Sequence, residues 1–218
     1  VVTLPEKNYT TKPEIYSTKS GLFPADHFYQ VYQDRAGNNW LLTDNGLGMI
    51  RPGEWQPVNY FVETQGKQDG MNQAFYAVRE CEDDICFTSD RGRIWCYQKK
   101  SGEFRLHELP TKARITSIHA VGNDNTVVTT DSDGFFLSNL KTNKHIHYSP
   151  VTCKELSDQP ILSAYVDRTS EVWFEQEEPG VVVHFNPATG VVKREQMRVE
   201  YSNADRSRPA FHIHEDIH

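Results

Sequence analysis

Two His-x-His pairs have the spacing in this sequence that comes nearest to a metal site. They are His145/His147 and His212/His214, and Glu215 follows the second pair. Alternate residues of a strand point to one face, so each pair could offer two imidazoles to a cation. Zinc usually needs three or four converging ligands, however, and nothing in the sequence brings the two pairs together. We therefore expect solvated or structurally hydrogen-bonded histidines, with no metal and no cofactor.

Neighbouring acidic residues are the second candidates for chemistry. Glu82-Asp83-Asp84 and Glu177-Glu178 each fall in a predicted turn. Glycoside cleavage needs two carboxylates that face each other across a cleft, and consecutive turn residues rarely do so. The sequence also lacks a Gly-x-Ser-x-Gly elbow and a glycine-rich phosphate loop. We predict no catalytic residues, while a lyase or glycosidase stays open as the alternative.

Both groups of residues lie in a sequence that repeats. Four segments each place an apolar run before a turn that ends in glycine: Asn39–Gly46, Asp84–Gly92, Asn125–Gly134 and Glu171–Gly180. The four closing glycines are 46, 42 and 46 residues apart. A repeat of this length, with several short strands in each copy, is typical of β-propeller blades.

Each copy predicts four strands separated by turns rich in Gly, Asn, Asp and Pro. The first copy gives strands at 28–33, 40–43, 48–51 and 55–62, and the second gives 74–79, 85–88, 93–98 and 103–108. The third gives 115–121, 126–130, 135–139 and 144–148, and the fourth gives 161–167, 171–175, 181–186 and 191–196. No helical period is sustained. The expected fold is all-β, with four-stranded antiparallel sheets as propeller blades.

These strands predict one incomplete propeller segment over residues 1–218. Its blades are expected at about 22–65, 71–110, 113–149 and 160–198, and 210–218 repeats the pattern of a first strand. An open stack of about four blades would leave two sheet faces exposed. We therefore expect the remaining blades of a larger propeller, from the same chain or a partner, to cover the ends.

Charge and hydropathy exclude several classes of protein. The net charge is −7, and the longest basic cluster is Lys99-Lys100, so we expect no nucleic-acid contacts. No apolar run reaches the length of a membrane span.

The cysteines Cys81, Cys86, Cys96 and Cys153 lack CxxC spacing. Free, mostly buried thiols are favoured. A Cys81–Cys86 contact stays open for an oxidising compartment.

The first copy resembles a known family. After Gly21-Leu22 it reads as an apolar strand, then Asp-x-x-Gly-Asn-x-Trp, a Thr step and a Gly-Leu turn. The matching residues are Asp34, Gly37, Asn38, Trp40, Thr43, Gly46 and Leu47. This pattern is similar to the propeller repeats in periplasmic sensor regions of hybrid two-component systems of gut Bacteroides-type bacteria. Leu42 stands where that family usually has Gly.

The other copies keep only part of this motif. The fourth copy has Asp167 and Trp173 but lacks the Thr. In the second and third copies Ile85 and Val127 replace the Trp. Thr88 and Thr130 are assigned to the Thr step of these two copies. The resemblance is therefore concentrated in the first copy and fades along the chain.

The resemblance implies a non-enzymatic sensor segment in the periplasmic part of an inner-membrane protein. Such a segment would bind a poly- or oligosaccharide and signal through a transmembrane histidine kinase. We also expect a homodimer of the full-length sensor. A propeller lyase or glycosidase, and a pure protein–protein assembly module, remain the alternatives.

We interpret the repeated motif as scaffold. Its residues are Asp34, Gly37, Trp40, Thr43, Gly46, Thr88, Gly92, Gly134, Trp173 and Gly180. The tryptophans are expected to be buried between blades. The glycines Gly37 and Gly46 are expected at positive φ, and Asp34 and Asn38 are expected to hydrogen-bond the turn backbone.

A ligand is expected instead at loops that differ between copies. The candidates are Asp44, Asn45, Asp90, Arg91 and Asp133. Glu178 and the loops at 21–27 and 66–72 would lie on the same face. Arg91 is the one cation among these turns and would suit an anionic sugar, unless it only pairs with Asp90 or Asp44 in solvent.

Overall fold

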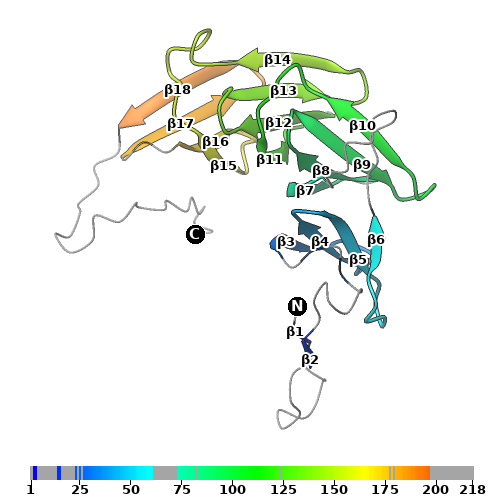
Figure 1. Cartoon of the computed structure of the whole chain (residues 1–218). Coiled ribbons are helices and arrows are strands. Elements are labelled where there is room, and N and C mark those ends of the chain that lie inside the picture. The colour runs from blue at the N-terminus through cyan, green and yellow to red at the C-terminus, as the bar shows by residue number, and fades with distance from the viewer. Residues whose placement is uncertain are drawn as a thin grey trace, which may run out of the picture. The chain divides into compact units, whose positions relative to one another are not determined.

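The computed structural model describes residues 2–3, 14–15, 23, 25, 27–60, 73–81, 83–122, 124–176, 178 and 180–196. The chain divides into two compact units, Val1–Tyr76 and Ala77–His218. All regular structure in the described residues is β, as Figure 1 shows. Those residues accordingly contain no helix that could cross a membrane.

The first unit contains a short strand pair and one four-stranded antiparallel sheet. The pair is β1 (Val2–Thr3) with β2 (Glu14–Ile15). The sheet has the order β3 (Phe28–Gln33), β4 (Asn39–Thr43), β5 (Gly46–Ile50) and β6 (Val58–Tyr60). Each strand pairs with the next in sequence, which is the meander of a propeller blade.

Three more sheets repeat this meander. The second sheet is β7 (Phe75–Glu80), β8 (Asp84–Ser89), β9 (Arg93–Gln98) and β10 (Phe104–Glu108). The third is β11 (Ile115–Ala120), β12 (Asn125–Thr130), β13 (Phe135–Asn139) and β14 (Lys144–Tyr148). The fourth is β15 (Ile161–Val166), β16 (Val172–Gln176), β17 (Val181–Asn186) and β18 (Val191–Gln196). The second unit holds these three sheets, except that β7 begins before the boundary.

Within the second unit the sheets are arranged as blades. Figure 1 shows the first strands β7, β11 and β15 on one side of this unit and the last strands β10, β14 and β18 on the opposite side. The prediction of an all-β fold built from four-stranded propeller blades is therefore confirmed. Six strands have the predicted bounds, and most of the others differ by one or two residues at an end.

The largest difference is the last strand of the first sheet. A strand was predicted over 55–62, but β6 begins at Val58. Pro57 precedes it and has no N–H to donate to a sheet ladder, so pairing starts after the proline. Residues 61–62 lie outside the described residues, as does the predicted start of a further blade at 210–218.

Apolar faces join consecutive sheets of the second unit. Between the third and fourth sheets, the Phe135 ring centroid lies 4.6 Å from that of Phe174 and 4.9 Å from that of Phe185. All three side chains are at most 1% exposed. Burying a side chain of this size contributes about 1.5–3 kcal/mol. Stacking of sheet on sheet therefore forms the core of this unit.

A second cluster joins the second sheet to the third. Ile94 of β9 packs with Ile118 and Val128 of the third sheet. Cys86 and Cys96 belong to the same cluster and are bonded to each other as a disulfide. The expectation of free thiols was wrong for these two. The two cysteines stand directly opposite in the β8–β9 hairpin, a register that sequence spacing alone did not define.

Counting thiols tests the disulfide. We expect the denatured, unreduced chain to react with two equivalents of a thiol reagent, at Cys81 and Cys153, which are not disulfide-bonded. Reduction should raise the count to four. Because the crosslink closes a loop of 10 residues, losing it should lower the unfolding free energy by about 3 kcal/mol. Four reactive thiols before reduction would show that the pairing is wrong.

Gly134 at the β12–β13 turn is a position where only glycine fits. Its φ is +65°, and a Cβ there would lie 2.1 Å from the carbonyl oxygen of Tyr148. Gly134→Ala should therefore lower the unfolding free energy by about 2 kcal/mol or more, measured by urea denaturation.

Gly122→Ala is the matched control for this substitution. Gly122 has a similar φ of +61°, but a Cβ there would meet nothing within 4 Å. Only the backbone cost of about 1 kcal/mol should remain. Equal losses at the two sites would show that the contact with Tyr148 does not matter.

Candidate functional site

The Asp34 carboxylate organises the turn between β3 and β4. Its Oδ1 accepts hydrogen bonds from the backbone N–H of Ala36 and of Asn38, at 3.0 and 2.9 Å. Its Oδ2 accepts from the Asn38 side-chain amide at 2.9 Å and from the Trp40 indole Nε1 at 2.8 Å. The side chain of Asn38 thus donates to the carboxylate. The expectation that it would hydrogen-bond the turn backbone was wrong.

These contacts determine the charge of Asp34. Burial raises the pKa of this carboxyl, but the hydrogen bonds from Trp40, Asn38 and Ala36 outweigh it and leave the pKa below its ordinary value. The residue is therefore an ionised acceptor with its oxygens occupied. Together with 6% exposure, this makes it a structural group of the turn.

The fourth copy repeats the same arrangement. Trp173 Nε1 donates to Asp167 Oδ2 at 2.7 Å, and Oδ1 accepts from the backbone N–H groups of Thr169 and Glu171. Trp173 is only partly buried, and its ring stacks on His184 with centroids 4.6 Å apart. His184 in turn lies between Glu171 and Glu195, with N–O distances of 3.1 and 3.2 Å.

The second and third copies fill the same positions with other residues. One backbone hydrogen bond closes the turn in every copy, and its donors are Asp34, Cys81, Val121 and Asp167. Cross-strand register then aligns the Trp40–Met49 pair with Cys86–Cys96 and Val127–Leu137. Cys86, and not Ile85, therefore occupies the Trp position of the second copy.

The threonine step closes the hairpin between the second and third strands. Thr43 Oγ1 donates to the Gly46 carbonyl at 2.8 Å, and Thr130 Oγ1 donates to the Gly134 carbonyl at 2.9 Å. In the second copy, the residue in this role is Ser89, whose Oγ is 3.3 Å from the Arg93 carbonyl.

Thr88, assigned to this step from the sequence, has a different part. Its Oγ1 accepts from the Ala77 backbone N–H at 3.1 Å, which ties β8 to β7. Its register partner is Ile94, as Phe135 is the partner of Thr129 in the third copy. The sequence analysis therefore placed this step one residue too early in the second copy.

The motif glycines have the expected backbone conformation. Positive φ angles occur at Gly37 (85°), Gly46 (108°), Gly92 (67°), Gly134 (65°) and Gly180 (73°). Trp40 is fully buried, with its ring stacked on Tyr60 of the outer strand at 5.8 Å between centroids. The motif residues therefore have structural contacts throughout the described chain.

The two tryptophans should differ in their effect on stability. Trp40→Ala should lower the unfolding free energy by about 3–5 kcal/mol, because it empties a fully buried site. Trp173→Ala should cost less, about 2 kcal/mol, because Trp173 is only partly buried. Urea denaturation of both variants measures the difference. Equal losses, or no loss for Trp40→Ala, would contradict the packing seen here.

The predicted ligand residues occupy hairpin tips in both units. Asp44 and Asn45 form the β4–β5 turn of the first unit, where the Asp44 N–H lies 3.4 Å from the His27 carbonyl oxygen. Asp90 and Arg91 form the β8–β9 turn of the second unit. Arg91 has a φ of +59°, is exposed, and makes no hydrogen bond or ion pair with another described residue.

Asp133, at the β12–β13 turn, contacts His147. Its carboxylate lies 3.2 Å and its carbonyl oxygen 2.8 Å from His147 Nε2. The His147 ring stacks on Phe136, with centroids 4.3 Å apart. His145 Nε2 is instead 3.2 Å from Asn143 Oδ1, so the pair of histidines does not converge. The described residues contain no group of three or more potential metal ligands, and His212 and His214 lie outside them.

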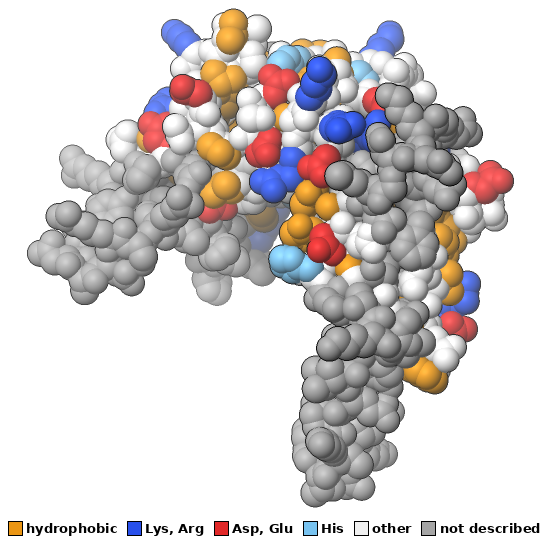
Figure 2. Space-filling model, viewed as in Figure 1, with side chains coloured by type: hydrophobic (Ala, Val, Ile, Leu, Met, Phe, Trp, Pro, Cys, Tyr) orange, Lys and Arg blue, Asp and Glu red, His pale blue; other side chains and the backbone are white. Residues whose placement is uncertain are grey.

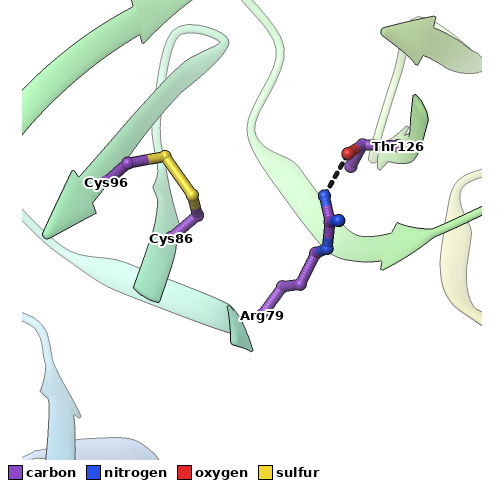
Figure 3. Close-up of a disulfide and its surroundings, with 4 residues drawn as sticks. All are labelled: Arg79, Cys86, Cys96 and Thr126. Carbon is purple, nitrogen blue, oxygen red and sulfur yellow. Dashed lines mark hydrogen bonds between the residues drawn. A yellow bond between two sulfur atoms is a disulfide. The ribbon is translucent and has the colours of Figure 1, made fainter. Parts of the chain in front are cut away.

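The sequence analysis did not single out His119, a histidine with a strongly lowered pKa. Burial, and then the positive charge of Arg79, lowers the pKa of His119 to about 4. Arg79 extends from β7 and donates to the Thr126 hydroxyl of β12, beside the disulfide in Figure 3. Arg79 lies in the second sheet and His119 in the third. We therefore interpret them as part of the contact between these two sheets.

Surface charge of the second unit is mixed. Figure 2 shows lysine, arginine and carboxylate side chains interspersed on the face in view, without a field of one sign. A shallow groove beside β18 has the same character. It is lined by Lys154, Glu155, Val192, Lys193, Arg194 and Glu195. Arg194 is paired with Glu178.

No protein-family model matches the chain, and no curated protein does either. Solved structures match it closely in fold. Two are extracellular domains of proposed hybrid two-component systems from B. thetaiotaomicron, at 17% and 18% identity and TM-scores of 0.65 and 0.63. They cover 77% and 78% of this chain, which spans only 23% and 24% of their length.

A third similar structure is an enzyme. It is a catalytically inactive variant of virginiamycin B lyase from Staphylococcus aureus, solved with quinupristin, at 14% identity and a TM-score of 0.67. The match covers 91% of this chain and 70% of the lyase. At these identities the three structures establish a shared fold, that of the propeller blades described above.

Proposed function

We propose that this chain is part of the extracytoplasmic sensor region of a two-component signalling protein and that the region binds an oligosaccharide. The observation that carries the proposal is the run of propeller sheets shared with the extracellular domains of two such systems. The motif match of the first copy points the same way, since its Asp34 and Trp40 are bonded as a repeated structural unit.

The disulfide supports a location outside the cytoplasm. Cys86 and Cys96 are each 2% exposed and join two strands of one hairpin. Disulfides of this structural kind persist in oxidising compartments such as the periplasm and are rare in the cytosol. We place the segment in the periplasmic part of an inner-membrane protein whose histidine kinase lies in another part of the full-length protein.

A binding role fits the contrast between repeated structural residues and variable hairpin tips within each copy. The repeated residues are occupied with structural hydrogen bonds, whereas the hairpin tips at Asp44-Asn45 and Asp90-Arg91 vary between copies and include exposed charge. Varied loops on a repeated scaffold are where binding residues concentrate. In the full-length sensor we propose a homodimer and further blades as the protein partners.

Thermal denaturation of the chain with a set of oligosaccharides tests the function. The set should include neutral chains, such as maltohexaose, xylohexaose and mannohexaose, and an acidic one, such as a chondroitin sulfate tetrasaccharide. A ligand present at 100 times its Kd stabilises by about 2.7 kcal/mol, which is a rise in Tm of about 5–10 °C for a domain of this size. Failure of every sugar to raise Tm at millimolar concentration would count against sugar binding.

The lyase is the second candidate, favoured by the shared fold with virginiamycin B lyase. Quinupristin, the compound in that structure, is the direct probe. We expect the chain to leave it intact. Cleavage that disappears when a single His or carboxylate is replaced would establish an enzyme and overturn the sensor proposal.

A further inference from the structure

The first strand contains an irregularity at the same place in the first, third and fourth sheets. The cross-strand register shifts between Phe28 and Gln30, between Ile115 and Ser117, and between Ile161 and Ser163. The bulged residues are therefore Tyr29, Thr116 and Leu162, and Tyr76 is the residue at this position of the second copy. A bulge turns its side chain away from the regular pleat, and bulges are frequent beside binding sites.

Two of these four positions hold tyrosine, and the rings meet. The Tyr29 and Tyr76 centroids lie 4.9 Å apart at a tilt of 54°, and the His27 ring stacks on Tyr29 at 5.3 Å with 24° between planes. His27, Tyr29 and Tyr76 all belong to the first unit. We call these three side chains the aromatic ladder.

Part of the ladder is exposed to solvent. Tyr29 is 45% exposed and His27 is also exposed, although large aromatic side chains are mostly buried. The Tyr29 hydroxyl makes no hydrogen bond with another described residue. Thr116, at the same position of the third copy, behaves differently. Its hydroxyl donates to the Ile161 carbonyl at 2.7 Å and so ties the third sheet to the fourth.

Polar groups stand beside the ladder. The Asp44 N–H lies 3.4 Å from the carbonyl oxygen of His27, which places the Asp44-Asn45 hairpin tip beside the backbone of the first ladder residue. An aromatic ring near a carboxylate and an amide can bind both the C–H face and the hydroxyl groups of a sugar ring. The C–H face packs on the ring, and the hydroxyls donate to Asp44. The negative charge disfavours an anionic ligand.

We propose that the aromatic ladder is a binding subsite for an uncharged pyranose unit, with Tyr29 as the stacking platform and Asp44 accepting from sugar hydroxyls. The proposal rests on the proposed function, since it names the sugar class and the residues of its site. Arg91, in the second unit, is a different candidate and suits an acidic sugar.

Isothermal titration of the whole chain with maltohexaose, xylohexaose, mannohexaose and a chondroitin sulfate tetrasaccharide tests it. We expect at least one neutral sugar to bind. Tyr29→Ala should weaken that sugar at least tenfold, while Tyr29→Phe keeps the ring and should stay within threefold. Leu162→Ala is the matched control, because Leu162 has the same bulge position and is 47% exposed. It should change neither binding nor the urea midpoint.

The outcomes separate the two proposals. If a neutral sugar binds equally well to wild type and Tyr29→Ala, the ladder is not the subsite, and sugar sensing stands. Binding of the chondroitin probe alone would likewise overturn the ladder and leave sugar sensing intact. A large fall in the urea midpoint for Tyr29→Ala, unlike Leu162→Ala, would assign the ring a structural role. If no sugar binds, both proposals fail.

Discussion

The hydrogen bond from the Trp40 indole to the Asp34 carboxylate ties the β3–β4 turn of the first sheet to strand β4. It connects the turn that follows the inner strand to the centre of the second strand, at 2.8 Å, while the other carboxylate oxygen satisfies the turn's own N–H groups. One side chain thereby sets the turn and the position of the buried ring together. The ring in turn reaches the outer strand through Tyr60.

The other copies meet the same requirement by different chemistry. Trp173 and Asp167 repeat the polar solution. Val121 and Val127 use apolar contact in the third copy, and Cys86 with Cys96 replaces the ring by a covalent bond. In each case the residue at the Trp40 position of the second strand bonds to, or packs with, another residue of its copy. The scaffold is thus conserved in geometry while its residues vary, and the hairpin tips are left free to differ.

The sequence predicts the strands well because their signals are local. Apolar alternation and glycine turns fixed six strands to the residue, and Pro57 explains why β6 begins late. The register between neighbouring strands was harder to predict. The Cys86–Cys96 pair and the role of Ser89 depend on hairpin register, and the sequence analysis placed both positions one residue too early in the second copy.

The candidate site was predictable only in part. Asp44 and Arg91 were found as loop residues, but the Tyr29–Tyr76 contact joins strands of two copies and is invisible in a single repeat. His119 is similar, because its burial and the charge of Arg79 come from packing between sheets. Side chains brought together by tertiary contacts have no spacing that a sequence pattern could detect.

A double-mutant cycle on Asp34→Asn and Trp40→Phe tests the central claim, that the carboxylate–indole bond is the structural tie of the repeat. Trp40→Phe retains a large ring but removes the N–H donor. Urea denaturation of the wild type, the two single variants and the double variant gives the coupling energy. We predict a coupling of about 1.5–3 kcal/mol, the range for a hydrogen bond to a charged group. Single losses that add to within about 0.5 kcal/mol would show that the two residues act independently and would contradict the account.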